Sequence, residues 1–240
     1  MTTIRIIQLY PRDMNLYGDW GNVLVLKKRL EWRGFAVEII DHNPGDATDF
    51  SIGDIFVGGG GQDSGQTVIQ DDLLARGEEL RQLVTGGAPM LLICGMYQLF
   101  GRRFVTGDGT EIRGIGALPV ETRAGEERLI GNITLENEQF GRMVGYENHS
   151  GQTFLDEGVT PLGQVVRGAG NNLADGHEGV LHHHVIATYL HGPLLPKNPR
   201  VADFLIRKAL ERKGLDAELA PLDIDTLAEE AQRVAAERVR

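Results

Sequence analysis

Residues 88–101 read APMLLICGMYQLFG, an unbroken apolar run followed directly by a helix-compatible segment. The run from Ala88 to Cys94 is short for a helix, and an apolar stretch of this length is typical of a parallel strand buried on both faces. Cys94 ends this predicted strand and Gly95 begins the helix. The pattern therefore predicts a sharp turn at the carboxyl end of a central strand, which is where open α/β sheets bind ligands.

The segments that precede this run alternate between strand and helix patterns. Three further short apolar runs read as strands: residues 3–9, 36–41 and 54–57. Two stretches with apolar residues at helical spacing lie between them, one from Asp19, which we expect to cap it, to Gly34, and one around Leu73, Leu80 and Leu83 that ends at Gly86-Gly87. We therefore predict an α/β fold with a doubly wound, mostly parallel sheet flanked by helices.

The second half of the chain predicts more strands and then a helical end. Short alternating runs near residues 129–135, 164–166 and 185–189 are expected to be further strands of the same domain. Helix patterns start at Asn198-Pro199 and at Asp225. We predict one domain over residues 1–240 with a C-terminal helical segment at about 198–240, whose last helix is either a solvated cap or a docking face for a partner.

Composition limits the classes of ligand. The 240 residues are 41% hydrophobic and 24% charged, with a net charge of -10 and no run of Lys and Arg, so we expect no nucleic-acid partner. The start shows no signal-peptide pattern, and no apolar stretch is long enough to predict membrane insertion. The single cysteine cannot form an internal disulfide, which fits a reducing compartment. We expect a cytoplasmic protein.

Cys94 is the candidate nucleophile. At a strand-to-helix turn, the N–H groups of the helix N-terminus favour the thiolate over the thiol. A small residue such as Gly95 also lets its backbone N–H approach a developing oxyanion. The alternative is that Cys94 is only a small buried hydrophobic residue, because free cysteine is among the most buried residue types.

Four glycines at residues 58–61 directly follow the predicted strand 54–57. A phosphate-binding function is disfavoured, because no Gly-Lys-Ser/Thr follows and the spacing misses the dinucleotide-binding fingerprint. We interpret the loop as a second oxyanion donor, with a flexible turn as the alternative. His191 ends another apolar run and precedes the turn residues Gly192-Pro193, so it is an available general base. Cysteine, glycine loop and histidine at three strand ends together favour one catalytic site, although each alone has a structural explanation.

Two other clusters of polar residues are open to functional interpretation. Glu147 and His149 lie on one face if residues 145–151 (GYENHSG) are extended, and we expect them to line or brace the pocket, with a polar turn as the alternative. In the run 182–184 of three histidines, only the first and the third can share a face of a strand. We therefore predict no metal site.

The segment LLICGMYQLFG (91–101) resembles the nucleophile segment of class I glutamine amidotransferases, especially their cobyric acid synthase-like branch, whose pattern is Cys-Gly-x-Tyr-Gln-x-x-Gly. Three more segments resemble that branch's glycine loop, pocket segment and histidine segment, in the same order: VGGGGQD (57–63), GYENHSG (145–151) and TYLHGPLLPKNP (188–199). Within the branch, the chain is most similar to the glutaminase subunits of lipid II isoglutaminyl synthases, which support amidation of D-glutamate in peptidoglycan precursors.

The resemblance implies a role for each matching residue. These are Cys94 as nucleophile, His191 as base, Gly60 and Gly95 as oxyanion donors, Gly61 in the substrate-binding loop, and Gln98 in holding substrate. It also implies that Arg128, in ERLIGN (127–132), binds substrate. A guanidinium can grip the free carboxylate of glutamine through two hydrogen bonds. The alternative is a solvated surface arginine.

The chain departs from the family pattern at two positions. Many class I amidotransferases have x-Glu after the catalytic histidine, whereas this chain has Gly192 and Pro193. The resemblance implies that the partner ligase supplies the orienting carboxylate, with Glu147 as the first internal candidate. Leu92 also stands where the family often has glycine.

The resemblance implies a glutaminase subunit that passes ammonia to a Mur-ligase-like synthetase, in a heterodimer. This chain would need no cofactor, because ATP, a divalent metal and the acceptor would be bound by the partner. One alternative is the amidotransferase component of corrinoid (cobyric acid) amidation. Another is a non-catalytic binding module on the same scaffold, which the missing x-Glu favours.

Overall fold

A computed structural model describes residues 2–238 of the chain. Its first sheet has six strands in the order β11-β12-β4-β3-β1-β2. Their bounds are Thr3–Leu9 (β1), Ala36–His42 (β2), Ile55–Gly58 (β3), Met90–Ile93 (β4), Val180–His182 (β11) and Val185–Thr188 (β12). All neighbouring pairs are parallel except β11 with β12. The carboxyl ends of β3, β4 and β12 therefore meet at one edge.

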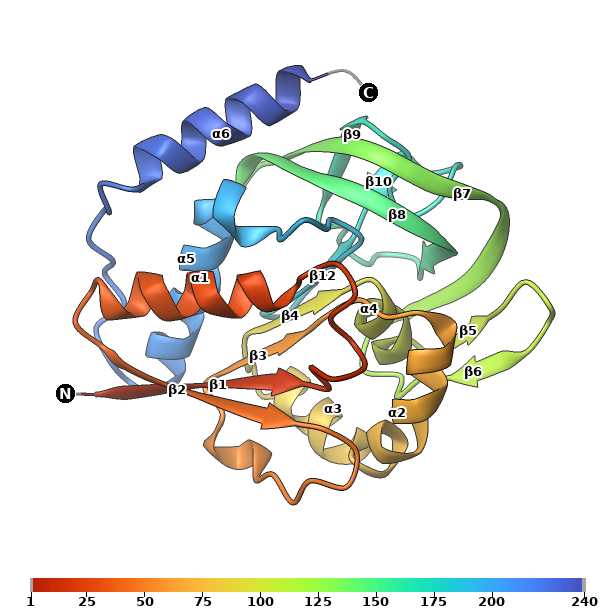
Figure 1. Ribbon diagram of the computed structural model, residues 1–240, viewed down its shortest axis with the longest axis horizontal. Helices are drawn as coiled ribbons and strands as arrows, with labels where there is room; N and C mark the ends of the chain where they lie inside the picture. The colour runs from red at the N-terminus through yellow and green to blue at the C-terminus, as the bar shows by residue number, and fades with distance from the viewer. Residues whose placement is uncertain (1, 239–240) are drawn as a thin grey trace.

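Helices cover both faces of this sheet (Figure 1). Helices α1 (Trp20–Glu31) and α5 (Pro199–Arg212) lie on one face, and α2 (Asp63–Ala75), α3 (Gly77–Thr85) and α4 (Gly95–Phe100) lie on the other. Two 3₁₀ turns complete the set, η1 (Phe50–Ile52) and η2 (Leu195–Lys197). The predicted doubly wound α/β fold is confirmed. The stretch around Leu73, Leu80 and Leu83 forms two helices, because the chain breaks at Arg76, whose guanidinium binds Glu79 and the Thr48 carbonyl.

Most of the later strands form a second sheet, in the order β10-β9-β7-β5-β6 with β8 paired to β7. Their bounds are Arg103–Val105 (β5), Glu111–Arg113 (β6), Val120–Asn137 (β7), Gly141–Leu155 (β8), Gly163–Arg167 (β9) and His177–Glu178 (β10). Of the three later runs predicted as strands, only the one at β12 joins the first sheet. Alternation along a strand predicts which side chains face inward, but it does not specify the neighbouring strand.

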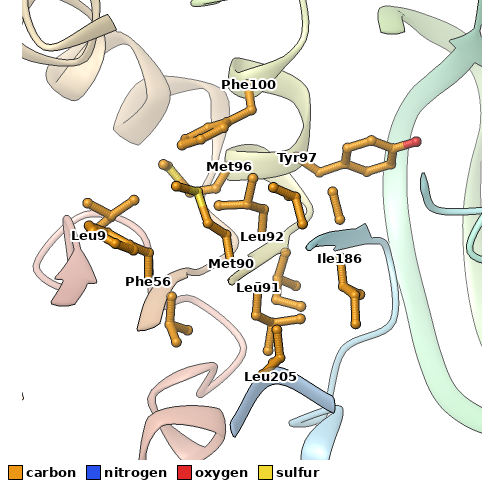
Figure 2. Close-up of a cluster of buried hydrophobic side chains, with 14 of the residues drawn as sticks. Leu9, Phe56, Met90, Leu91, Leu92, Met96, Tyr97, Phe100, Ile186 and Leu205 are labelled. Carbon is orange, nitrogen blue, oxygen red and sulfur yellow. The ribbon is translucent and has the colours of Figure 1, made fainter. Parts of the chain in front are cut away.

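The core of the first sheet surrounds β4. All four of its residues are buried, as expected for a central strand covered on both faces. Figure 2 shows side chains from β1, β3, β12 and α5 gathered around it, including Leu9, Phe56, Ile186 and Leu205. Leu92, which stands where related proteins often have glycine, is fully buried in this cluster. This packing fixes the strand whose end carries Cys94.

The C-terminal helix α6 (Asp225–Glu237) lies on the outside of the molecule (Figure 1) and has no buried side chain. It is fastened by the buried Arg29 of α1, whose guanidinium binds both Asp203 of α5 and Asp225. Both predicted helix starts in this segment are confirmed. Within residues 2–238, no helix is both long and apolar enough to cross a membrane.

Candidate active site

Cys94 occupies the turn between β4 and α4, as the sequence predicts. Its backbone has φ 50° and ψ -102°, an uncommon conformation for a residue other than glycine. The backbone N–H of Cys94 donates to the Thr188 carbonyl at 2.8 Å, which ties the turn to the end of β12. Its side chain is 6% exposed and lines a cavity of about 390 Å³. The strained turn therefore presents the thiol to a space large enough for a small substrate.

Gly60 lies against Cys94 and His191, but its N–H group is not free. A Cβ atom at this position would lie 2.9 Å from His191 Cε1 and 3.2 Å from Cys94 Cβ, so the close approach requires glycine. The Gly60 N–H, however, donates to Asp19 Oδ2 at 2.7 Å. The prediction that it is an oxyanion donor therefore does not hold in this structure.

The neighbouring glycines offer free donors in its place. A Cβ atom at Gly95 would lie 3.3 Å from the Gly61 nitrogen, so the glycine loop and the first residue of α4 approach closely. Within residues 2–238, the backbone N–H groups of Gly61 and Gly95 have no hydrogen-bond partner. Together they form a pair of donors beside Cys94 that suits an oxyanion.

His191 is 1% exposed and follows the end of β12. Its backbone pairs with Tyr146 of β8 through bonds of 2.8 and 3.2 Å, and its ring lies against Tyr17 with centroids 4.1 Å apart. Neither ring nitrogen has a hydrogen-bond partner among the described residues. Burial lowers the pKa of His191, but the negative charges of Cys94 and Asp19 raise it more, to about 9. The imidazole is therefore cationic at neutral pH, which suits pairing with a thiolate.

Asp19 places a carboxylate of this chain near His191, so an internal candidate for the orienting acid exists beside the predicted one from a partner. Its Oδ1 lies 3.8 Å from His191 Nδ1, and both side chains are buried. Asp19 does stand at the N-cap position of α1, but its side chain makes no capping bond. The alternative internal candidate, Glu147, is directed elsewhere, since its carboxylate accepts the backbone N–H groups of Ala169 and Gly170. The sequence gives no signal for the role of Asp19, because the contact depends on how residues 10–19 fold over the sheet edge.

Arg128 lies on β7 at the wall of the same cavity. Its Nε donates to Asn148 Oδ1 at 2.7 Å and its Nη2 donates to the Tyr17 hydroxyl at 3.2 Å. In the described part of the chain, no carboxylate forms an ion pair with Arg128. Its positive charge therefore remains available to an anionic group of a ligand.

Gln98 is buried at the cavity wall within a hydrogen-bond network. Its Oε1 accepts from Gln66 Nε2 at 2.8 Å, and its Nε2 donates to the Tyr189 hydroxyl at 3.1 Å. The Gln66 amide oxygen is buried at the same wall without a partner among the described residues. The sequence does not identify Gln66 as a site residue, because it is one of several polar residues in the α2 segment. One amide hydrogen of Gln98 and the oxygen of Gln66 can still bind a ligand.

His149 also lines the cavity and lies on the same face of β8 as Glu147, as predicted for an extended segment. Its ring stacks on Tyr189 at a centroid distance of 3.6 Å, and its Nδ1 lies 2.6 Å from the Gly151 carbonyl. Burial lowers the pKa of His149 to about 4, so the ring is neutral and its Nδ1–H donates to that carbonyl. Glu147 braces the adjacent loop. No cluster of three or more metal-ligating side chains occurs within residues 2–238.

The sequence matches the CobB/CobQ-like glutamine amidotransferase domain over residues 5–199. It is 40% identical to the lipid II isoglutaminyl synthase (glutamine-hydrolyzing) subunit GatD of Staphylococcus aureus, over 99% of this chain and 97% of that protein. The GatD subunit of Streptococcus pneumoniae is also 40% identical, over 95% of this chain and 88% of that protein. A probable cobyric acid synthase of Methanococcus maripaludis is 31% identical, over 71% of this chain and 36% of that protein.

Solved structures show the same architecture at lower identity. A glutamine amidotransferase superimposes with a TM-score of 0.58 at 20% identity, covering 87% of this chain and 99% of that one. A glutamine amidotransferase of Thermotoga maritima gives a TM-score of 0.55 at 14% identity, covering 97% of this chain and 93% of that one. These likenesses concern the fold.

Proposed function

Because the chain belongs to the CobB/CobQ-like glutamine amidotransferase family, we propose that it hydrolyses glutamine at Cys94 and His191 as a subunit of a lipid II isoglutaminyl synthase. The observation that carries this proposal is the pairing of a strained, cavity-lining cysteine with a buried cationic histidine around Gly60. The alternative of a non-catalytic module is disfavoured, because a binding scaffold has no need of this pair.

The reaction begins with attack of the Cys94 thiolate on the side-chain carboxamide carbon of glutamine. The resulting oxyanion is stabilised by the backbone N–H groups of Gly61 and Gly95. The His191 imidazolium then donates its proton to the leaving nitrogen, and ammonia departs from a thioester intermediate. Neutral His191 next removes a proton from water, whose oxygen attacks the thioester, releases glutamate and restores the thiolate.

The cavity suits free glutamine. Arg128 binds the α-carboxylate, because its guanidinium has no carboxylate partner of its own within residues 2–238. Gln98 and Gln66 contribute the remaining amide donor and acceptor described above. The negative charges of Cys94 and Asp19 together keep His191 cationic, and Asp19 also orders Gly60 by accepting its N–H. This half of the reaction uses no cofactor.

Ammonia would be consumed by a Mur-ligase-like synthetase that binds ATP, a divalent metal and the D-glutamate-containing acceptor. The proposal of a separate partner is supported by the relatives named as GatD subunits, which are matched over 97% and 88% of their length. The sequence alone does not indicate which residues of this chain contact the partner. In the structure, the exposed apolar side chains Leu16, Trp20 and Tyr146 lie beside the site. We propose that the synthetase covers this face.

Corrinoid amidation is the second candidate, because probable cobyric acid synthases are 31% identical over about 70% of this chain. The two functions differ in the acceptor. The test is glutamate release by the chain mixed either with a Mur-ligase-like synthetase and lipid II or with a cobyric acid synthetase and a corrinoid acid, each with ATP and Mg²⁺. Stimulation and amide transfer with lipid II alone is the expected result. Transfer to the corrinoid, or no glutamate release with either acceptor, would contradict the proposal.

A further inference from the structure

Glu178 is a buried carboxylate that the proposed reaction does not use. It lies on β10 and is fully buried, and among the described residues no cation forms an ion pair with it. Its Oε1 accepts the Tyr189 backbone N–H at 2.6 Å, and its Oε2 accepts the Thr188 hydroxyl at 2.8 Å. Burying a carboxylate without a cation costs free energy, so we expect its two hydrogen bonds to stabilise the Thr188–Tyr189 segment that they hold.

The segment that Glu178 holds connects both members of the catalytic pair. The Thr188 carbonyl accepts the Cys94 N–H at 2.8 Å, and the Thr188 hydroxyl also accepts the Leu190 N–H at 3.1 Å. His191 follows immediately. Pairing of β12 with β4 ends at Thr188, so the Tyr189 N–H lies beyond the sheet and would be buried without a partner if Glu178 were absent.

Counting donors and acceptors shows that the hydrogen bonds around Glu178 favour its ionised form. The carboxylate accepts two protons, from the Tyr189 N–H and the Thr188 hydroxyl, and that hydroxyl oxygen accepts the Leu190 N–H. A protonated Glu178 would add a donor, and the Thr188 hydroxyl would then lose its acceptor. Hydrogen bonding therefore opposes the effect of burial, which raises the pKa of Glu178 to about 8.

The charged and titratable groups that face Glu178 come from several elements. Glu147 of β8 raises its pKa, whereas the positive charge of His191 lowers it. Tyr97 of α4 and Tyr189 are also close, and burial raises the pKa of both phenols, so they remain neutral. His191 is thus the cation that most favours the charged form of Glu178.

We propose that Glu178 is a positioning residue for the Cys94–His191 pair, acting through its bonds to Thr188 and Tyr189. The inference rests on the proposed function, because it takes Cys94 and His191 to be the catalytic pair. Without Glu178, the Tyr189 N–H must find another partner, and the segment that carries His191 shifts. A displacement of about 1 Å at a catalytic group costs about 100-fold in rate.

The test uses the rate at which iodoacetamide alkylates Cys94, measured against pH. Cys94 is the only cysteine of the chain, so total labelling reports this one residue. Glu178→Ala is expected to reduce the rate at pH 7 by about tenfold or more, because a thiol that loses its imidazolium partner is only a few per cent thiolate at that pH. An unfolded Cys94 would also lack an imidazolium partner, so the rate is compared only after circular dichroism shows that Glu178→Ala is folded as the wild type is. The assay needs neither glutamine nor a partner, so it is independent of the assigned substrate.

Two further variants separate the two hydrogen bonds. Glu178→Gln keeps an acceptor for the Tyr189 N–H but turns an amide donor toward the Thr188 hydroxyl, so its alkylation rate is expected to lie between those of wild type and Glu178→Ala. If Glu178→Ala does not fold, Thr188→Val removes one of the two bonds and is expected to slow alkylation measurably. A wild-type rate and pH profile in Glu178→Ala or Thr188→Val would overturn the proposal, as would an equal loss in Glu178→Gln and Glu178→Ala.

Asp54→Ala is the matched control. Asp54 is also a buried carboxylate that accepts a backbone N–H, from Arg5 at 2.8 Å, but it precedes β3 at the opposite edge of the sheet. The control is expected to lose stability while its alkylation profile stays unchanged. A profile altered as in Glu178→Ala would show that any loss of stability produces the effect and would refute the positioning role.

Discussion

Replacing Asp19 by asparagine tests whether this chain supplies its own orienting carboxylate. Asparagine keeps a side-chain oxygen that can accept the Gly60 N–H, which Asp19 Oδ2 now accepts at 2.7 Å. The glycine loop should therefore keep its position. What the variant loses is the negative charge whose Oδ1 lies 3.8 Å from His191 Nδ1.

The size of the effect follows from that distance. Two unit charges about 4 Å apart interact by about 4 kcal/mol at an effective dielectric constant of about 20, which suits a site in contact with a cavity. Each 1.36 kcal/mol corresponds to about tenfold in rate, so full loss of this stabilisation of the imidazolium predicts a decrease in kcat/KM of up to about 10³-fold. Because the contact is longer than a hydrogen bond, we expect about 10²- to 10³-fold.

The assay is glutamate release against pH, for the reconstituted complex and for the chain alone. The pKa of His191 is raised to about 9, partly by Asp19, so the alkaline limb of kcat/KM should move to lower pH in Asp19→Asn. Asp19→Ala, which also releases the Gly60 N–H, should be the more damaging variant. Activity of Asp19→Asn within threefold of wild type, with an unmoved alkaline limb, would refute the reasoning and assign the orienting acid to the partner.

The remaining predictions concern the catalytic pair and its pocket. Cys94→Ser is expected to abolish glutamine hydrolysis with an unchanged circular dichroism spectrum, since a hydroxyl is a far weaker nucleophile than a thiolate; retained activity would exclude Cys94. His191→Ala should be equally inactive and the double variant little worse, because the two act as a unit, whereas additive losses would contradict this. Arg128→Ala should lower kcat/KM by one to two decades, or about 1.5 to 3 kcal/mol, without lowering Tm, and unchanged kinetics would place the arginine outside the pocket. The raised pKa of His191 gives the folded state a stability advantage that is complete below pH 6.5 and is lost as pH rises through about 9. The Tm of wild type relative to His191→Gln should therefore fall over that range, and a constant difference would refute it.

What could be predicted from the sequence is mostly local. The turn at Cys94 follows from an apolar run, a small residue and a helix pattern in direct succession, and β4, Cys94 and α4 occur as predicted. The same holds for the start of α5 at Pro199, since proline is preferred in the first turn. Parallel strands then bring the glycine loop, Cys94 and His191 to one edge without further information.

What could not be predicted depends on contacts between distant segments. Asp19 is 172 positions from His191 in the chain, and its position before a helix suggested a capping role that its side chain does not fill. The Gly60 N–H was expected to be free, because nothing local shows that a loop from residues 10–19 reaches it. Nothing in the sequence links Glu178 to the site, because its partners Thr188 and Tyr189 lie at and just beyond the end of another strand.

The fastening of α6 by Arg29 has a consequence for the behaviour of the protein in acid. Burial raises the pKa of Asp225, but the hydrogen bond and charge of Arg29 lower it more, so this attachment is complete above pH 3.8 and is lost as pH falls below it. No side chain of the helix is buried, and the remaining attachment includes the hydrogen bonds from Gln232 Nε2 to the Arg142 and Lys197 carbonyls. Release of the helix would remove one wall of the apolar groove of about 420 Å³ between α1 and α6 and so expose side chains such as Leu24, Trp32 and Leu195 more fully. Strong acid is therefore expected to make the protein self-associate through this surface before its sheets unfold.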